Sequence, residues 1–242
     1  MRALIIAHDH VSPAGPVAER LVQRGFAVDE LLVVPEERFA TPGVEAAFPD
    51  PMRYDAIVPM GAPWSADDEA LIGSWLLPER EMLRRAQAGA VPVLGICFGG
   101  QALAVALGGG VERAPRPEIG WVDIVSDDTD LVEPGPWFQF HYDRWRVPPG
   151  ALEIARNDSA SQAFRLGRSL AVQFHPELTS AALEGWLELG GRAEVMANGQ
   201  DPDAMLARTR TEDAAARERA HRLVDRFLDR VAQVAASPGR PD

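Results

Sequence analysis

The sequence predicts an α/β protein: a mostly parallel open sheet with helices on both faces, extra antiparallel strands in the second half and helices near the C-terminus. Three observations predict this fold class. In the first half, short apolar runs alternate with stretches of helical periodicity. In the second half, β-rich segments follow one another, joined by turns that contain Pro, Gly or Asp. From residue 202 the helical pattern returns.

The strands expected in the first half are short apolar runs, namely ALIIA (3–7), VDELLVV (28–34), DAIVPMG (55–61) and VPVLGI (91–96). Continuous apolar runs separated by helices indicate a parallel sheet that is covered on both faces. The helix expected over 15–26 places Val17, Leu21 and Val22 on one face. A second, long helix is expected within 67–88.

The antiparallel strands expected in the second half are EIGWVDIVSDD, WFQFHYD, ALEIARND and AFRLGRSLAVQFHP. The helical pattern of 202–234 carries an apolar stripe that should dock on the core, formed by Ala220, Leu223, Val224, Phe227, Leu228 and Val231. No break in composition divides the chain. The sequence therefore predicts one domain over 1–235 and a disordered tail over 236–242.

Composition excludes several classes of function. The formal net charge is −12, which offers no clustered positive charge for nucleic acid or an anionic membrane. The basic residues are all arginine, so a phosphate-loop lysine and a Schiff-base lysine are both ruled out. A single cysteine makes no internal disulfide, and no apolar stretch reaches the roughly 18 residues of a membrane helix. We expect a cytoplasmic protein.

That single cysteine, Cys97, lies in GICFGGQ, where an apolar run gives way to a helical pattern. Gly95 and Gly99 flank it as in a nucleophile elbow, a sharp strand-to-helix turn at which only glycine fits beside the nucleophile. The helix N-terminus supplies free N–H groups and a positive dipole end that favour a thiolate. The pattern alone leaves open an inert buried cysteine, because free cysteines are usually buried.

A base for such a nucleophile is found in SLAVQFHPEL. A strand delivers His175, and Pro176 biases its backbone toward the extended conformation. Residues i and i+2 of an extended chain face the same side, so Glu177 is expected beside the imidazole, where it raises its basicity and fixes its tautomer. A metal pair is the weaker interpretation, because no second histidine–carboxylate set stands at ligand spacing.

Other candidate positions are less specific. VPMGAPWSADDE (58–69) ends a strand in a turn that can present a backbone N–H to the site. His8 and His10 follow the first strand and either line a site or form a polar loop. His221 is expected at the surface beside the apolar face of the last helix. Three tryptophans either line a pocket or pack in the core or rim, namely Trp64, Trp121 and Trp145.

Taken together, these motifs resemble the class I (triad-type) glutamine amidotransferase family, whose fold is flavodoxin-like. GICFGGQ resembles the family's G-x-C-x-G-x-Q elbow, and FHPE resembles its His-Pro-Glu element. MGAPWS is similar to its oxyanion turn, and EIGW and FHYDRWRVPPGALEIARND are similar to stand-alone members related to the amidotransferase part of GMP synthase. The resemblance covers most of residues 1–190.

The resemblance implies a role for each matching residue. Cys97 is then the nucleophile, His175 the base and acid, and Glu177 the residue that orients the imidazole. The N–H groups of Ala62 and Phe98 form the oxyanion hole. Two further residues are candidates for substrate binding, Gln101 and His141, and for His141, which together with Asp143 is expected near the same sheet edge, a turn-stabilising role stays open.

One departure from the family pattern concerns the oxyanion turn. The family usually has a second glycine where this chain has Ala62. If that backbone has a positive φ, alanine costs about 1 kcal/mol and the N–H is aimed less well.

The implied reaction is hydrolysis of the side-chain amide of glutamine, or of a γ-glutamyl compound, through a cysteine thioester, with no cofactor and no metal. Three alternatives stay open at this point. The chain is a glutaminase subunit that feeds ammonia to a separate acceptor synthetase, a free-standing γ-glutamyl hydrolase or peptidase, or a non-catalytic binding or regulatory module of the same fold.

Overall fold

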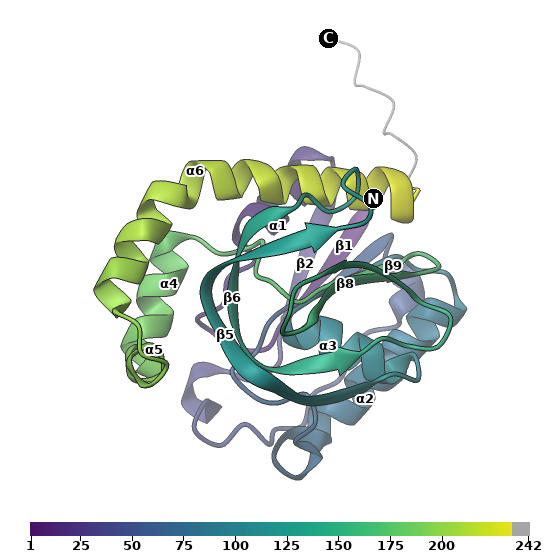
Figure 1. Ribbon diagram of the computed structural model, residues 1–242. Helices are drawn as coiled ribbons and strands as arrows, with labels where there is room; N and C mark the ends of the chain where they lie inside the picture. Colours follow the sequence, from purple (N-terminus) through teal and green to yellow (C-terminus); the bar gives the residue numbers. More distant parts are fainter. Residues whose placement is uncertain (234–242) are drawn as a thin grey trace.

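A computed structural model describes residues 1–233 (Figure 1). Nine strands form the sheet, in the order β2-β1-β3-β4-β9-β8-β7-β5-β6. The strands are β1 (Arg2–Ala7), β2 (Ala27–Leu32), β3 (Ala56–Pro59), β4 (Val93–Ile96), β5 (Gly110–Ser126), β6 (Gly135–Arg146), β7 (Leu152–Arg156), β8 (Ser161–Leu166) and β9 (Ser169–Val172). The predicted tail, 236–242, lies outside the described residues.

Six α-helices accompany the sheet, namely α1 (Gly15–Gln23), α2 (Glu69–Ala88), α3 (Phe98–Ala106), α4 (Ser180–Trp186), α5 (Arg192–Ala197) and α6 (Pro202–Arg226). Single-turn helices lie at Glu36–Arg38 and Pro51–Arg53, and wider helical turns at Leu187–Gly191 and Phe227–Val231. None of the helices within residues 1–233 is both long and apolar enough to cross a membrane.

The parallel part of the sheet consists of β2, β1, β3, β4 and β9. Its strands are the predicted apolar runs, and their carboxyl ends meet at one edge, where open α/β sheets bind ligands. One prediction for this region is wrong. We expected β9 among the antiparallel strands, but it runs parallel to β4 and antiparallel to β8, so it joins the two parts of the sheet.

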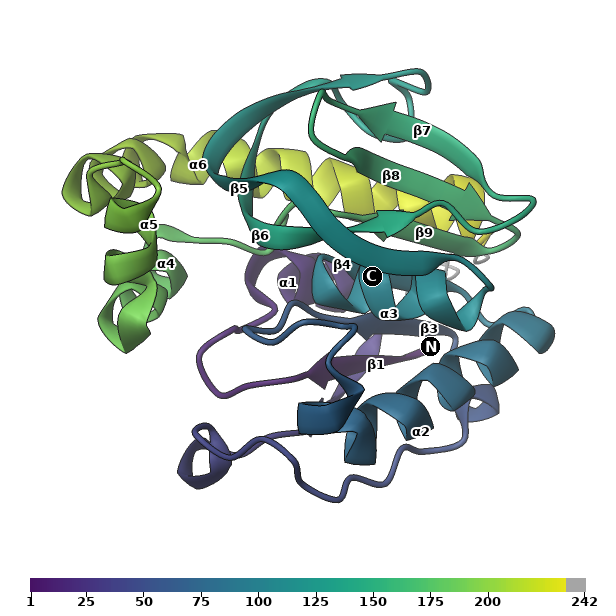
Figure 2. The same ribbon diagram turned by 60° about the horizontal axis from the view of Figure 1, so that its bottom comes forward.

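The antiparallel part is an extension built on β8, β7, β5 and β6. β5 is 17 residues long and pairs with β6 along most of its length, with a register shift between Arg113 and Glu118. Figure 2 shows β5 as a long curved ribbon that arches over α3. The pair thereby carries residues of β6 toward the carboxyl edge of the parallel strands.

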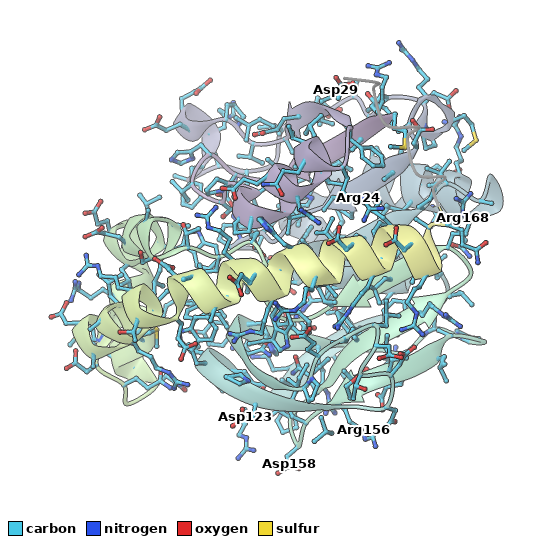
Figure 3. All side chains as sticks on the ribbon, turned by 90° about the horizontal axis from the view of Figure 1, so that it is seen from above. Arg24, Asp29, Asp123, Arg156, Asp158 and Arg168 are labelled. Atoms are coloured by element: carbon cyan, nitrogen blue, oxygen red, sulfur yellow. The ribbon has the colours of Figure 1, made fainter. Side chains whose placement is uncertain are left out.

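Helices cover both faces of the sheet, as predicted. α1 and α6 pack on one face, and α2 and α3 pack on the other. The predicted apolar stripe of the last helix is buried at every position, namely Ala220, Leu223, Val224, Phe227, Leu228 and Val231. Figure 3 shows α6 lying lengthwise across the molecule, with Arg24 beside it.

Two details of the predicted parallel half are corrected. Val17 and Leu21 of α1 are buried, but Val22 is 59% exposed, because the residue after Leu21 is turned by about 100° around the helix axis and faces solvent. β2 is the edge strand of the sheet and its side chains are mostly half-buried or exposed, whereas β1, β3 and β4 are buried.

α4, α5 and the first turns of α6 form a helical projection at one side of the molecule (Figure 1). Its apolar residues, among them Leu183, Val195 and Leu206, pack with Ile119 of β5 and Phe138 of β6 in a third cluster. This projection therefore borders the end of the sheet at which the candidate site lies.

Candidate active site

Cys97 lies at the turn between β4 and α3, in a strained backbone conformation. Its φ is 48° and its ψ is −107°, which is unusual for a residue with a side chain. The turn is held from both sides, since the Cys97 N–H donates to the Val172 carbonyl at 2.8 Å and the Gln101 N–H donates to the Cys97 carbonyl at 2.9 Å. Strain of this kind persists where the surroundings impose it, typically at functional sites.

The two glycines predicted to flank the nucleophile are required by close packing. A Cβ on Gly99 would overlap the carbonyl group of Pro59 at the end of β3, and a Cβ on Gly95 would lie 2.9 Å from the Gly100 Cα. Real Cβ atoms do not approach backbone so closely. The chain passes through this turn only because both positions lack a side chain.

His175 follows β9 and lies next to Glu177, as the extended backbone predicted. The His175 Nδ1 lies 2.8 Å from the Glu177 Oε1, and the His175 N–H donates to the Phe138 carbonyl. The edge of the ring faces Trp186, with the ring centroids 5.1 Å apart. The Nε2 is buried and has no hydrogen-bond partner among the described residues. One nitrogen is thus fixed by the carboxylate and the other is available for proton transfer.

The charge balance around His175 favours its protonated form. Burial disfavours the imidazolium, but the nearby Glu177 carboxylate and the Cys97 sulfur outweigh burial and raise the pKa of His175 well above 6.5. Such an imidazolium stabilises a thiolate beside it and holds a proton for a leaving group.

The predicted oxyanion turn follows β3 and faces the elbow. The N–H groups of Ala62 and Phe98 donate to no acceptor among the described residues, and both residues line the same cavity as Cys97. Ala62 is not one of the residues with a positive φ, so the conformational cost considered for alanine does not arise. The tight position is the preceding one, because a Cβ on Gly61 would lie 3.0 Å from the His175 Cε1.

Gln101 belongs to a chain of amides that reaches the cysteine. Its Nε2 lies 3.0 Å from the Asp143 carbonyl oxygen and 3.4 Å from the Gln173 Oε1. Gln173, which is fully buried, points its own Nε2 at the Cys97 Sγ at 3.6 Å. We did not predict Gln173, although a signal was present: it precedes His175 by two residues in an extended segment and so faces the same side.

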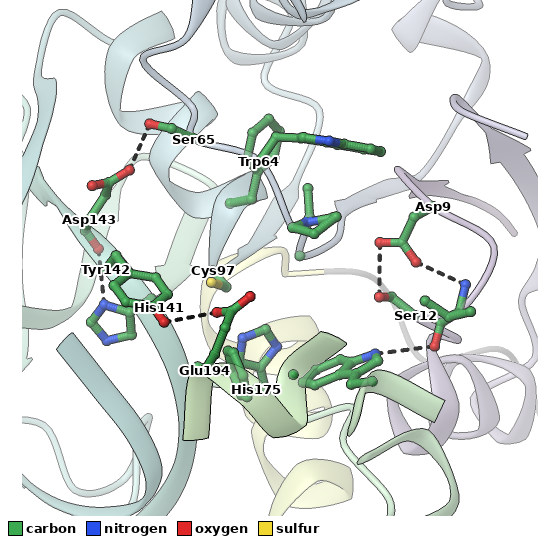
Figure 4. Close-up of a pocket in the computed structure, with 18 of the residues that line it drawn as sticks. Asp9, Ser12, Trp64, Ser65, Cys97, His141, Tyr142, Asp143, His175 and Glu194 are labelled. Atoms are coloured by element: carbon green, nitrogen blue, oxygen red, sulfur yellow. Dashed lines mark hydrogen bonds between the residues drawn. The ribbon is translucent and has the colours of Figure 1, made fainter. Parts of the chain in front are cut away.

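His141 lines the cavity, but its ring nitrogens already face protein groups. Nδ1 lies 2.9 Å from the Asp143 carbonyl oxygen, and Nε2 lies 3.2 Å from the Glu118 Oε2. The ring therefore shapes the wall of the cavity, while a direct contact with substrate stays a prediction. Asp143 also lines the cavity and accepts a hydrogen bond from Ser65 at 2.6 Å (Figure 4).

The other histidines differ in their surroundings. His8, expected either in a polar loop or at a site, is fully buried behind the oxyanion turn and does not line the cavity. His10 packs edge-on against Phe39. His221 is partly exposed near Glu19 on the far helix, as expected.

The cavity has a volume of about 230 Å³ and opens at the carboxyl edge of the parallel strands (Figure 4). Trp64 lines it, whereas Trp145 is buried in the core and Trp121 packs against Phe138. Sequence reasoning missed the outer wall, which is formed by Phe39, Arg113, Phe140, Tyr142, Trp186 and Glu194. Only the folded chain brings these residues together.

Part of this outer wall is ordered by its own contacts. The Tyr142 hydroxyl donates to the Glu194 Oε2 at 2.8 Å, and the Arg113 guanidinium lies over the tyrosine ring, 4.6 Å from its centroid. Burial, together with the Glu194 carboxylate, raises the pKa of Tyr142 to about 12, so its hydroxyl stays a donor. Among residues 1–233, no three His, Cys, Asp or Glu side chains are grouped as a metal site would need.

An open α/β sheet, a cysteine at a strand-to-helix elbow and a histidine–glutamate pair on the neighbouring strand define the class of triad-type cysteine hydrolases. Within that class the chain belongs to the class-I glutamine amidotransferase family, because the family model "Glutamine amidotransferase class-I" matches residues 19–186.

Curated relatives agree with this family. The chain is 31% identical over 137 residues to the glutamine-hydrolysing subunit of the GMP synthase of Saccharolobus solfataricus, and the match covers 52% of this chain and 69% of that protein. It is 36% identical over 113 residues to the GMP synthase of Aeropyrum pernix, covering 41% of this chain. The match spans only 22% of that longer protein.

Solved structures show the same fold. A glutamine amidotransferase from Thermotoga maritima matches with a TM-score of 0.81 and 24% identity, covering 95% of this chain and 98% of the other. A glutamine amidotransferase from Methylobacillus flagellatus matches with a TM-score of 0.80 and 23% identity, covering 100% and 98%.

Proposed function

We propose that this protein hydrolyses the side-chain amide of glutamine through a thioester on Cys97 and releases ammonia for a separate acceptor enzyme. The observation that carries the proposal is the arrangement at the end of β4 and β9. A cysteine held at positive φ shares a cavity with a histidine whose one nitrogen is bound to Glu177 and whose other nitrogen is free among the described residues. This is the arrangement that nucleophilic acyl transfer requires.

In the proposed acylation step, the Cys97 thiolate attacks the side-chain carbonyl carbon of glutamine. The negative charge that develops on the carbonyl oxygen is stabilised by the N–H groups of Phe98 and Ala62. The C–N bond then breaks, and His175 gives its Nε2 proton to the nitrogen, which leaves as ammonia. The product is a γ-glutamyl thioester on Cys97.

In the deacylation step, the now neutral His175 takes a proton from water, and the hydroxide attacks the thioester carbonyl. The carbon–sulfur bond breaks, glutamate leaves, and the thiolate–imidazolium pair is restored. Glu177 keeps the imidazole in one tautomer and orientation through both steps.

The proposed acceptor is a synthetase on another polypeptide. Support comes from relatives in Saccharolobus solfataricus and Ignicoccus hospitalis, whose names describe each of them as one subunit of a glutamine-hydrolysing GMP synthase. Ammonia made by one such polypeptide has to reach a partner that carries the acceptor chemistry.

A second candidate function is hydrolysis of γ-glutamyl amides larger than glutamine. The outer wall supports it, because aromatic rings and the Glu194 carboxylate line the cavity beyond the elbow, where a leaving amine larger than ammonia would lie. The two candidates share the thioester and differ in the leaving group.

Two measurements test these proposals. Treatment with an alkylating glutamine analogue should place the label on Cys97, as mapped by mass spectrometry. Absence of label on the folded protein, under conditions that label the denatured chain, would refute the nucleophile. Ammonia release from glutamine, compared with amine release from γ-glutamyl dipeptides, then chooses between the two candidates. Purification from the native host shows whether a synthetase accompanies the chain.

A further inference from the structure

A buried histidine–glutamate pair lies directly behind the oxyanion turn and has no part in the triad. His8 follows β1 and Glu79 lies on α2, and both side chains are completely buried. The His8 Nε2 lies 3.1 and 3.0 Å from the two oxygens of Glu79. A buried pair of ionisable groups is costly to fold, because both must leave water. Such a pair therefore invites a functional explanation.

The other nitrogen of His8 reaches the oxyanion turn. Its Nδ1 lies 3.1 Å from the carbonyl oxygen of Gly61. That carbonyl belongs to the same peptide unit as the N–H of Ala62, which is one of the two proposed oxyanion donors. The peptide is trans, so its C=O and N–H point in opposite directions. Holding the carbonyl on the buried side therefore directs the Ala62 N–H toward the cavity that Ala62 lines.

The partners of the ring determine its protons. A carbonyl oxygen only accepts hydrogen bonds, so the His8 Nδ1 must carry a proton. An ionised Glu79 likewise only accepts, which places a second proton on Nε2. Burial disfavours this imidazolium, but Glu79, the Gly61 carbonyl and Asp9 outweigh burial and raise the pKa of His8. A hydrogen bond from a cationic donor polarises the peptide and makes its N–H a stronger donor.

His8 also contacts the second donor residue. Its ring meets the Phe98 ring edge-on, with the centroids 4.8 Å apart, and stacks on Trp75 at 5.5 Å. The histidine thus contacts both of the residues whose N–H groups are the proposed oxyanion donors or flank one.

We infer that His8 and Glu79 are positioning residues that hold the Gly61–Ala62 peptide with its N–H directed at the oxyanion. This inference rests on the proposed function, since it assigns the pair a role in the same reaction. It also accounts for the alanine at position 62: the peptide is fixed by a hydrogen bond, and the residue needs no positive φ.

The kinetic test replaces both members of the pair together, as H8F with E79L, so that no buried charge is left alone. Exchanging both partners for apolar groups of similar size is nearly neutral for folding. We expect kcat for glutamine to fall about 10- to 100-fold, near the loss seen when an oxyanion donor is removed. KM should change little, because the donor acts on the transition state.

Alkylation of Cys97 by iodoacetamide separates this role from a general structural one. That displacement forms no tetrahedral oxyanion, so its rate should stay within about twofold of the wild-type rate. An equal fall in alkylation and in kcat would overturn the inference, as would an unchanged kcat. E79Q keeps an acceptor for Nε2 and should lose less than the double variant. H221Q, which changes a histidine beside Glu19 far from the site, should leave both rates unchanged.

A second measurement does not depend on activity. Nitrogen NMR of the histidine rings in the unmodified protein should show a proton on the His8 Nδ1 and a coupling across the hydrogen bond to the Gly61 carbonyl carbon. An unprotonated Nδ1 would overturn the inference even if glutamine is hydrolysed. If wild-type protein releases no ammonia from glutamine, the proposed function fails, and the NMR result alone then decides whether His8 holds the peptide.

Discussion

At the scale of single residues, the site consists of one strained residue surrounded by groups that hold it. Cys97 has a positive φ, Val172 and Gln101 bond to its backbone, and the Gln173 amide points at its sulfur. His175 is held in the same way by Glu177. Because every polar contact of the triad is local and buried, single substitutions should have separable effects on the sulfur and on the imidazole.

The first such prediction concerns Glu177 and the pH dependence of turnover. A raised His175 pKa means that the imidazolium persists at neutral pH and is lost as the pH rises through that pKa, so kcat should fall only on the alkaline side. E177Q removes the main attraction, lowers the pKa of His175 and should move this alkaline fall to lower pH. We also expect kcat to drop by about two to four orders of magnitude.

The measurement is a pH–rate profile of ammonia release. E184Q, an exposed glutamate of α4 paired with Arg210, is the control and should retain the wild-type profile. An E177Q profile with an unmoved alkaline limb would mean that the limb does not report His175.

The second prediction concerns Gln173. Its amide is the only side-chain donor to the Cys97 sulfur among the described residues. Q173L should slow iodoacetamide alkylation of Cys97 about 10-fold, since a hydrogen bond to a charged group is worth about 1.5–3 kcal/mol. Q139L removes an equally buried amide that bonds to Gln162 instead, and it should leave the alkylation rate unchanged. Equal rates in both variants would show that the amide does not act on the sulfur.

At the scale of elements, the elbow works because β3, β4 and α3 approach one another at backbone distance. The Gly99 N–H donates to the Met60 carbonyl at 2.9 Å, which ties the start of α3 to the oxyanion turn. The nucleophile and the oxyanion donors are thus fixed relative to each other by main chain, and the glycines permit the approach.

A pair of glycine-to-alanine substitutions tests this. In G99A the new methyl group meets the Pro59 carbonyl, so the elbow must shift. We expect a loss of about 1–3 kcal/mol of stability together with most of the activity. G185A places a methyl group on α4 where no atom lies within 4 Å, and it should stabilise the protein by about 0.5–1 kcal/mol. Thermal unfolding measures both, and a neutral G99A would contradict the close approach.

At the scale of the whole molecule, the cavity is assembled from segments far apart in the chain. The loop after β1, the turn after β3, the elbow, β6, the strand end at His175 and the turn before α5 all contribute to its lining. β9 is central to this assembly, because it pairs with β4 on one side and with the antiparallel extension on the other. The two parts of the sheet therefore meet at the triad.

Ion pairs also fasten the last helix to the first. Asp225 of α6 accepts hydrogen bonds from both Arg20 and Arg24 of α1 and its C-terminal end, at 2.7 to 2.9 Å (Figure 3 labels Arg24). Burial works against the charge of Asp225, but the two guanidinium groups outweigh it and lower its pKa. A lowered carboxyl pKa stabilises the fold above the ordinary aspartate pKa, and this stabilisation is lost as the pH falls through the lowered value.

D225N should therefore lower the melting temperature by about 2–4 °C near pH 7, corresponding to about 1 kcal/mol. The difference from wild type should vanish below about pH 3, where the wild-type carboxylate is protonated. E218Q, which changes a mostly exposed carboxylate on the same helix, is the control and should alter the melting temperature little. A difference that persists in acid would mean that the amide disturbs packing rather than charge.

Much of the fold and the central chemistry was predictable from local patterns. The alternation of apolar runs and helical stripes gave the order of the elements, because burial of one face sets the period of each segment. Gly95, Gly99, Pro176 and the spacing of His175 to Glu177 are also local, since backbone sterics and strand alternation act over a few residues.

Only the tertiary structure decided which distant groups meet. The direction of β9, the outer wall with Tyr142 and Glu194, and the position of His8 beside Glu79 depend on pairings across the sheet and between layers. The backbone angle at Ala62 was equally hidden, because a buried histidine that follows another strand fixes that peptide. By itself the sequence determined the elements and the reacting groups. The packing of those elements decided how the groups are aimed, because that depends on contacts between residues far apart in the chain.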